Sequence, residues 1–332
     1  MRSATRPATT FGRRCLATLI VFGALTSCTT NPAAVVRSPS VTPGARACPT
    51  PSTRAFELRA GRQSLSLIHD GLGRTSFVQL PTGYNSTVPA PLLVSLHPFA
   101  LTNQGWEDYS HLADAATARG YVVVSPLGSD PGPRWSVPGG LPGPDDLGFV
   151  DQLVASVAAE LCIDTTRIFA AGFSAGAAMA MGLSCTYPGL FAGVAASGGA
   201  NLTSLCPESP GVDTLILHGL NDPISPTSGS YVVFAPPLGL NLFTVLSSTA
   251  ARNGCDQAVE AVPEFAFTDV RRYVGCDAGH RLQFWQMSTA GHTWAGTDPV
   301  IGAFLGGTSQ DFSANTVVLD FFDGHTVAVP AT

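Results

Sequence analysis

Short apolar runs alternate along the chain with longer segments in which apolar residues recur three and four positions apart. The runs predict buried strands, and the longer segments predict amphipathic helices. The expected strands are residues 92–96, 121–125, 167–171, 193–197, 214–217 and 282–287. The expected helices are residues 107–118, 145–161, 175–187 and 313–322. This alternation predicts an α/β fold with a mostly parallel central sheet and helices on both faces.

An antiparallel hairpin is expected before the parallel strands. Residues 64–68 and 75–78 flank the turn sequence Asp70-Gly71-Leu72-Gly73. Further along, Asp145 and Asp146 are expected to cap the helix at 145–161. In a mostly parallel sheet, functional sites form at the carboxyl ends of the strands. Candidate catalytic residues are therefore those that directly follow a strand.

Composition narrows the chemistry. With 45% hydrophobic and 12% charged residues, the 332-residue chain can bury a sizeable core. All 17 basic residues are Arg, which excludes a Ser-Lys dyad, a lysine Schiff base and a P-loop lysine. The formal charge is −6 with no basic run after the N-terminus, so nucleic acid is not expected as a partner. We expect no metal and no organic cofactor.

The N-terminus has the organisation of an export signal. Four Arg precede the apolar stretch 15–24, which is too short to span a bilayer as a helix. The sequence Leu25-Thr26-Ser27-Cys28 resembles the lipobox of bacterial lipoproteins; the alternative is an ordinary signal with an incidental Cys. We expect a lipoprotein signal peptide at 1–27, a Pro/Ser/Thr/Ala-rich tether at 28–55 and a single catalytic domain at 56–332. The protein would be extracellular or at the cell surface, lipid-anchored to the bacterial membrane through Cys28.

Six further cysteines indicate disulfides in an oxidising compartment. The sequence alone leaves 15 connectivities open. We expect Cys185–Cys206 and Cys255–Cys276 as local loop links. Cys48–Cys162 would then fasten the N-terminal segment to the domain.

The motif Gly172-Phe173-Ser174-Ala175-Gly176 is the central candidate for chemistry. It ends an expected strand and begins an expected helix of small residues. That context is typical of a nucleophile elbow, in which a strained turn exposes a serine hydroxyl. The alternative is a structural strand-to-helix turn with an ordinary serine.

A serine nucleophile needs a base and an acid that orients the base. His292 follows the strand at 282–287, so its side chain reaches the carboxyl edge of the sheet, whereas His280 precedes the same strand. Asp222 follows the strand at 214–217 and lies between Ser174 and His292 in chain order. The alternative for Asp222 is a turn-forming Asp before Pro223.

The reaction also needs two backbone donors to form an oxyanion hole. We expect the N–H of Ala175 as one donor, because it follows the nucleophile. The second should come from the loop His97-Pro98-Phe99-Ala100 after the strand at 92–96. Because Pro98 has no N–H, Phe99 is the candidate.

Residues 92–298 resemble the family of secreted esterases that includes poly(3-hydroxybutyrate) depolymerases, feruloyl esterases and acetylxylan esterases. Besides the elbow, the matching stretches are 145–150, 163–168, 187–192, 218–223 and Gly291-His292-Thr293-Trp294-Ala295-Gly296. The resemblance implies an α/β-hydrolase fold and a Ser-Asp-His triad, which falls on Ser174, Asp222 and His292.

The chain departs from the family pattern in the oxyanion loop. Family members commonly have His-Gly where this chain has His97-Pro98, and many have a glycine in place of Ala177. Trp135 resembles an aromatic residue of the family near the substrate cleft, and the alternative is a partly buried loop Trp. We expect His97, Trp135 and Trp294 in the substrate pocket.

The expected activity is hydrolysis of a small or oligomeric ester through an acyl-enzyme, by a monomer. Two alternatives stay open: an acyltransferase of the cell envelope, and a non-catalytic surface-binding lipoprotein. Aromatic, acetyl and hydroxyalkanoate esters are all compatible with the sequence.

Overall fold

A computed structural model describes residues 35–44, 47–49, 60–129, 132–229, 239–256, 259–298 and 304–324. The chain divides into two units, Met1–Thr30 and Asn31–Thr332, and all described residues belong to the second. The predicted signal peptide and Cys28 therefore lie outside the described residues. Within the described ranges, no helix is long and apolar enough to cross a bilayer.

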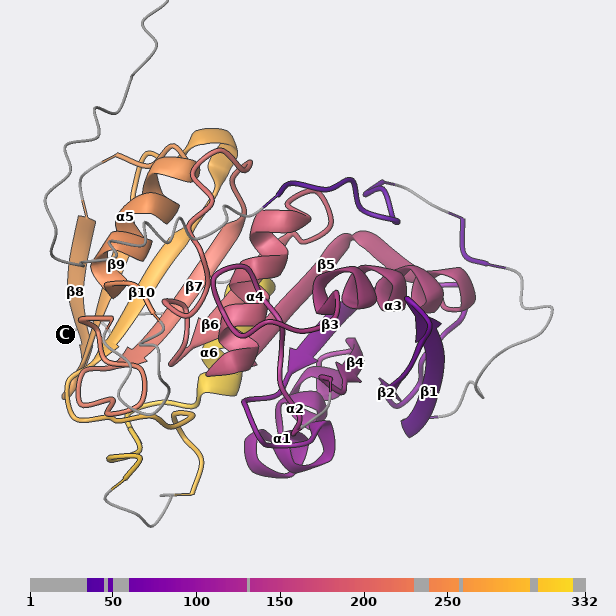
Figure 1. Ribbon diagram of the computed structural model, residues 1–332, viewed down its shortest axis with the longest axis horizontal. Helices are drawn as coiled ribbons and strands as arrows, with labels where there is room; N and C mark the ends of the chain where they lie inside the picture. The colour runs from indigo at the N-terminus through magenta and orange to yellow at the C-terminus, as the bar shows by residue number, and fades with distance from the viewer. Residues whose placement is uncertain are drawn as a thin grey trace, which may run out of the picture. The chain divides into compact units, whose positions relative to one another are not determined.

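A twisted sheet runs through the second unit in the order β1-β2-β4-β3-β5-β6-β7-β10-β9-β8 (Figure 1). Strands β4, β3, β5, β6, β7 and β10 are parallel, and antiparallel strands extend the sheet at both edges. The strands are β1 Gly61–His69, β2 Leu72–Leu80, β3 Ala90–Leu96, β4 Val122–Pro126, β5 Ile163–Phe173, β6 Gly193–Ser197, β7 Asp213–Gly219, β8 Val259–Phe265, β9 Thr268–Tyr273 and β10 Leu282–Met287.

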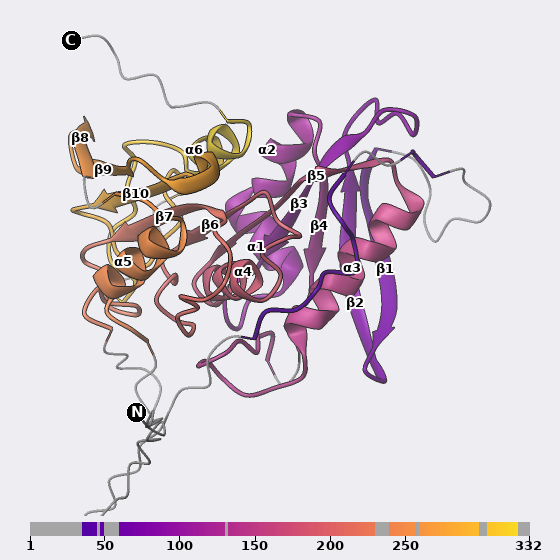
Figure 2. The ribbon, with the colours of Figure 1, turned by 90° about the horizontal axis from the view of Figure 1, so that it is seen from above.

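Helices cover both faces of this sheet. Figure 2 shows α3, α4 and α5 on one side and α2 and α6 on the other. The helices are α1 Asn103–Ser110, α2 Leu112–Ala118, α3 Asp146–Glu160, α4 Ala175–Thr186, α5 Leu242–Arg252 and α6 Ala314–Phe322. This arrangement confirms the predicted mostly parallel sheet with helices on both faces.

Two hydrophobic cores explain why the parallel strands are apolar throughout. In β3, Leu92 and Val94 pack in the core beneath α3, α4 and α5, whereas Leu93 packs in the core beneath α2 and α6. Successive side chains of a strand point to opposite faces, so a strand covered on both faces needs apolar residues at every position. The short apolar runs in the sequence reflect this two-sided burial.

Several elements differ from the sequence prediction. The single helix expected at 107–118 is two helices, because His111 adopts a left-handed conformation with φ 53° and ends α1. The hairpin turn consists of Asp70 and Gly71 alone, because Leu72 already pairs with His69. Helix α5 and strands β8 and β9 were not predicted. Asp146 is the first residue of α3 and binds Arg74, so Asp145 alone caps the helix.

Part of the segment expected to be a tether is packed against the domain. Arg37 forms an ion pair with Asp145 next to α3, and the backbone N–H of Ser40 donates to Asp151 within that helix. The hydroxyl of Thr165 donates to the carbonyl of Gly44. These contacts hold residues 35–44 along one face of the domain, which the weak apolar periodicity of this segment did not indicate.

All three predicted disulfides are present: Cys48–Cys162, Cys185–Cys206 and Cys255–Cys276. The first links the N-terminal segment to the start of β5 across 114 positions, and the other two each close a loop between residues 21 positions apart. Three disulfides in one domain are consistent with an oxidising, extracellular compartment.

Candidate active site

Ser174 lies on a strained turn between β5 and α4. Its backbone has φ 55° and ψ −117°, a conformation that few non-glycine residues adopt and that is concentrated at functional sites. Glycines make the turn possible, because a Cβ at Gly172 would lie 2.4 Å from the backbone of Gly176, and one at Gly176 would lie 2.1 Å from the Leu96 carbonyl oxygen. The structure therefore has the strand-turn-helix geometry expected of a nucleophile elbow.

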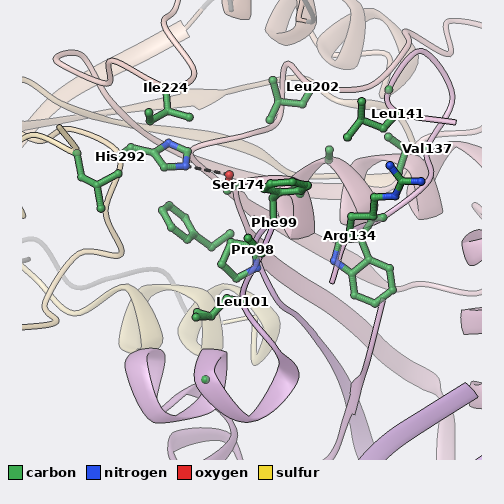
Figure 3. A pocket seen from close by; sticks show the side chains of 18 of the residues that line it. Pro98, Phe99, Leu101, Arg134, Val137, Leu141, Ser174, Leu202, Ile224 and His292 are labelled. Atoms are coloured by element: carbon green, nitrogen blue, oxygen red, sulfur yellow. Dashed lines mark hydrogen bonds between the residues drawn. The ribbon is translucent and has the colours of Figure 1, made fainter. Parts of the chain in front are cut away.

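The three side chains expected to form a triad are hydrogen-bonded in series. The Oγ of Ser174 lies 2.9 Å from Nε2 of His292, as the dashed line in Figure 3 marks. Nδ1 of His292 lies 2.7 Å from Oδ2 of Asp222. A carboxylate only accepts, so Nδ1–H donates to Asp222, and Nε2 is left to accept the hydroxyl proton of Ser174.

Asp222 is held in its loop by backbone donors as well as by His292. The N–H groups of Ile224 and Ser225 donate to its Oδ1 at 2.8 and 2.7 Å. Burial by itself would raise the pKa of Asp222, but the hydrogen bond and charge of His292, together with the Ser225 N–H, lower the pKa below its ordinary value. Asp222 is therefore an anion hydrogen-bonded to Nδ1 of His292.

Neighbouring groups fix the position of the His292 imidazole. The ring of Phe173 packs against it with the centroids 4.7 Å apart. The backbone N–H of His292 donates to the carbonyl of Leu305, and a Cβ on Gly291 would lie 2.1 Å from that carbonyl oxygen. Phe173 is the variable position of the elbow motif, so the motif itself did not indicate this role.

The oxyanion donors expected from the sequence lie at the same site. Ala175 begins α4, and the N–H groups of the first helical turn have no carbonyl within the helix to bind. In the facing loop Pro98 has no N–H, and the N–H of Ala100 donates to the carbonyl of Pro133. Phe99 therefore stays the candidate for the second donor in this loop.

His97 is buried behind the cavity wall and does not line the cavity, contrary to the sequence expectation. Its Nε2 accepts a hydrogen bond from the N–H of Gly128 at 2.8 Å, so Nδ1 carries the proton and donates to the carbonyl of Pro98 at 2.8 Å. Burial lowers the pKa of His97 to about 4 despite the Pro98 carbonyl, which keeps the ring neutral. His97 thus holds the oxyanion loop from behind.

The two tryptophans expected in the pocket have different places. Trp135 lines the cavity, and its indole N–H donates to the carbonyl of His97. Trp294 does not line the cavity, which corrects the expectation. It is buried beneath the wall against Trp106, and its indole N–H donates to Asn315. Trp294 therefore supports the segment after His292 and does not face a substrate.

A cavity of about 600 Å³ opens beside Ser174 and His292. Figure 3 shows that its walls come from several separate loops. Apolar side chains dominate the lining, including Pro98, Phe99, Leu101, Val137, Leu141, Leu202, Ile224, Phe304 and Leu305. Most of these residues stand in loops without a recognisable motif, and the sequence analysis did not identify them. A cavity of this size and character suits an organic ester of moderate size.

One group of potential metal ligands lies apart from the cavity. Within the described ranges, one cluster, His69, Asp70 and Asp145, brings together groups that could share a metal ion. None of the three residues lines the cavity beside Ser174.

The chain is similar in sequence to known esterases. Residues 78–233 match the family described as esterase PHB depolymerase. Feruloyl esterase D of Neurospora crassa is 27% identical over 256 residues, covering 73% of this chain and 81% of that protein. Probable feruloyl esterase C of Aspergillus flavus is 26% identical over 59% of this chain and 68% of its own length.

The coverage of other relatives is smaller. Feruloyl esterase B of Piromyces equi is 32% identical over 126 residues, but this chain spans 24% of that protein. Among solved structures, an acetyl xylan esterase from Aspergillus awamori superposes with a TM-score of 0.53 at 18% identity, covering 70% of this chain and 94% of that one. The sheet topology and this likeness together show the α/β-hydrolase fold.

Proposed function

We propose that this carboxylic ester hydrolase, which is similar in sequence to PHB depolymerases and feruloyl esterases, works through a Ser174–His292–Asp222 triad and an acyl-enzyme. The observation that carries the proposal is the unbroken series of hydrogen bonds from Ser174 through His292 to Asp222. The apolar cavity at Ser174 supplies the place where an ester can bind.

In the acylation step, Oγ of Ser174 attacks the ester carbonyl carbon while Nε2 of His292 accepts the hydroxyl proton. The carbonyl oxygen becomes an oxyanion, which the N–H groups of Ala175 and Phe99 stabilise. The imidazolium of His292, stabilised by Asp222, then protonates the leaving alcohol as the carbon–oxygen bond breaks. The product of this step is an ester between the acyl group and Ser174.

Deacylation repeats the same proton transfers with water. His292 removes a proton from a water molecule, which attacks the acyl carbonyl, and the oxyanion forms in the same place. His292 then returns the proton to Oγ of Ser174, which releases the carboxylic acid. Both steps use the same groups in the same positions, so one fixed arrangement serves the whole cycle.

Replacement of the nucleophile tests this proposal. We expect Ser174→Ala to lower kcat for p-nitrophenyl acetate and butyrate by about 10⁶-fold, because the acyl-enzyme cannot form. Circular dichroism and the thermal midpoint should stay close to wild type, since the substitution removes one small hydroxyl. Undiminished turnover by the folded variant would contradict the triad.

The relatives and the cavity together favour apolar or aromatic esters as substrates. The sequence relatives are described as feruloyl esterases, and the cavity lining is mostly apolar. We propose that the acyl or alcohol group of the substrate is held by apolar contact with Phe99, Leu202 and Ile224. A panel of p-nitrophenyl esters that differ in acyl length and aromaticity would rank these groups by kcat/KM.

We also propose that the protein is a monomer anchored by a lipid on Cys28 and held outside the membrane by the segment before residue 35. The sequence Leu25-Thr26-Ser27-Cys28 supports this anchor. Expression in a bacterial host with a radioactive fatty acid should label the wild type and leave Cys28→Ser unlabelled. Equal labelling of both proteins would reject the anchor, and gel filtration of the Cys28→Ser protein tests the monomer.

A further inference from the structure

Arg134 places a guanidinium in the wall of the cavity beside Ser174. Among the described residues that line the cavity, it alone carries a permanent charge. In the part of the chain that the structure describes, its guanidinium forms no ion pair and no hydrogen bond with the protein. Five other arginines instead bind aspartate carboxylates: Arg37, Arg74, Arg119, Arg167 and Arg281.

The surroundings of Arg134 make this charge unusual. Figure 3 shows the guanidinium beside Val137 and Leu141, on the far side of Phe99 from His292. The Arg134 side chain is only partly exposed, and the neighbouring lining is apolar. A partly desolvated guanidinium in such surroundings gains free energy when an anion binds to it, because few water molecules compete for its donors.

The backbone around Arg134 is held at several points, so the side chain starts from a fixed place. The carbonyl of Arg134 accepts a hydrogen bond from the N–H of Ser129, and a Cβ on Gly128 would lie 2.2 Å from that carbonyl oxygen. On one side, the carbonyl of Pro133 accepts from Ala100 in the oxyanion loop. On the other side, the N–H of Ser136 donates to the buried carboxylate of Asp146. Such anchoring lowers the entropy lost when the guanidinium binds a ligand.

We propose that Arg134 binds a carboxylate on the substrate, so that the preferred substrate is an ester with a carboxylate at one end. The reacting ester carbonyl lies at Ser174, an apolar part of the substrate packs against Phe99, and the carboxylate lies at Arg134. The planar guanidinium can bind both oxygens of a carboxylate at once. The inference rests on the proposed ester hydrolysis and names the substrate class of that site.

The test uses matched esters that differ in one terminal group. For the acyl arm the pair is p-nitrophenyl hexanoate and mono-p-nitrophenyl adipate, in which a carboxylate replaces the terminal methyl. For the alcohol arm the pair is phenyl butyrate and p-carboxyphenyl butyrate. The quantity measured is the ratio of kcat/KM for the carboxylate ester to kcat/KM for its neutral partner.

We expect the ratio for one pair to fall by about 10- to 100-fold in Arg134→Gln, the range typical for loss of a charge-assisted hydrogen bond. The kcat/KM for the neutral ester should fall less than the kcat/KM for the carboxylate ester. Arg271→Gln is the matched control, because Arg271 lies on β9 and does not line the cavity. Arg134→Glu should reverse the preference toward p-nitrophenyl ε-aminocaproate, which carries an ammonium in the same place.

Equal ratios in wild type and Arg134→Gln for both pairs, including the case in which charged and neutral esters lose activity equally, would overturn the inference while the proposed function stands. A fluorophosphonate probe separates this from failure of the proposed function, since a wild type that hydrolyses no ester and leaves Ser174 unlabelled rejects both. If Arg134→Gln does not fold, the same kcat/KM ratio is measured for the wild type at increasing salt concentration. A ratio that falls with ionic strength supports the contact, and a constant ratio overturns it.

Discussion

Single residues set the chemistry of this site through their backbone as much as through their side chains. Ser174 is held in a strained conformation with a positive φ of 55°. Asp222 fixes the tautomer of His292, because its carboxylate accepts from Nδ1–H. Gly128 fixes the tautomer of His97, because its N–H donates to Nε2. The two histidines follow different strands of one sheet edge, yet one contacts Ser174 and the other supports a loop. Residue type and position after a strand therefore predict that a side chain lies at this edge of the sheet, but not which role that side chain has.

The orienting role of Asp222 gives a prediction at this scale. Asp222→Asn keeps the shape of the side chain, but the amide can present a donor to His292 and stabilise the wrong tautomer. We expect kcat/KM for p-nitrophenyl butyrate to fall by about 10⁴-fold with little change in KM. Asp256→Asn, outside the cavity, is the control. A loss of less than about tenfold would show that another group orients His292.

Burial of neutral His97 predicts how stability depends on pH. The folded protein holds the pKa of His97 at about 4, below the ordinary value of 6.5. Between these two values the unfolded chain binds a proton that the folded chain does not, so stability falls as the pH falls. The resulting loss in the free energy of unfolding reaches about 3 kcal/mol at pH 4.

His97→Gln removes this pH-dependent loss of stability. The glutamine side chain can still accept a hydrogen bond from the N–H of Gly128. Urea unfolding of both proteins between pH 7 and 4 measures the slope of the unfolding free energy. We expect the slope of the variant to be smaller by up to about 1.4 kcal/mol per pH unit. Parallel curves for the two proteins would show that His97 is not held neutral.

At the scale of elements, the site depends on loops fastened to helices and strands at a few points. Asp146, at the start of α3, accepts from Arg74 of β2 at 2.6 Å and from the N–H of Ser136 at 2.7 Å. One carboxylate thus joins a strand, a helix and the loop that carries Arg134 and Trp135. The sequence predicted that Asp146 caps the helix. It did not predict the pairing with Arg74, because the two residues lie 72 positions apart in the chain.

Asp146→Ala should therefore be far more destabilising than the same change next to it. The substitution leaves the Arg74 guanidinium buried without its carboxylate, and we expect a loss of about 3–5 kcal/mol in the free energy of unfolding. Asp145→Ala, which removes a helix cap and an exposed ion pair, should lose about 1 kcal/mol. Equal losses in urea denaturation would contradict the account of this buried pair.

For the whole molecule, local patterns predicted the parallel sheet, the elbow and the strand ends that carry Asp222 and His292. Periodicity sufficed there, because strands buried on both faces are apolar at every position. It did not predict α5, β8 and β9; β8 and β9 lie at the edge of the sheet, and most residues of β9 are only partly buried or exposed. The prediction that His97 and Trp294 line the pocket was wrong, because a position next to a motif does not determine which way a side chain faces.

The disulfide that fastens the N-terminal segment was predicted from the sequence, whereas the packing of residues 35–44 against the domain was not. Residues 35–44 contact the domain through polar groups of α3 and β5, and Cys48–Cys162 closes a loop across 114 positions. Serine at both cysteines should lower the free energy of unfolding by about 4–5 kcal/mol. The same change at Cys255 and Cys276, which are 21 positions apart, should lower it by about 3 kcal/mol. An unchanged unfolding midpoint without Cys48–Cys162 would contradict this role.

The acyl-enzyme itself offers the most direct test of the central claim. The protein is mixed with excess p-nitrophenyl butyrate, quenched in acid within milliseconds, digested and analysed by mass spectrometry. We expect a butyryl group on the peptide that contains Ser174 and no such group in Ser174→Ala. A butyryl group on any other residue, or full turnover without an adduct at Ser174, would contradict it.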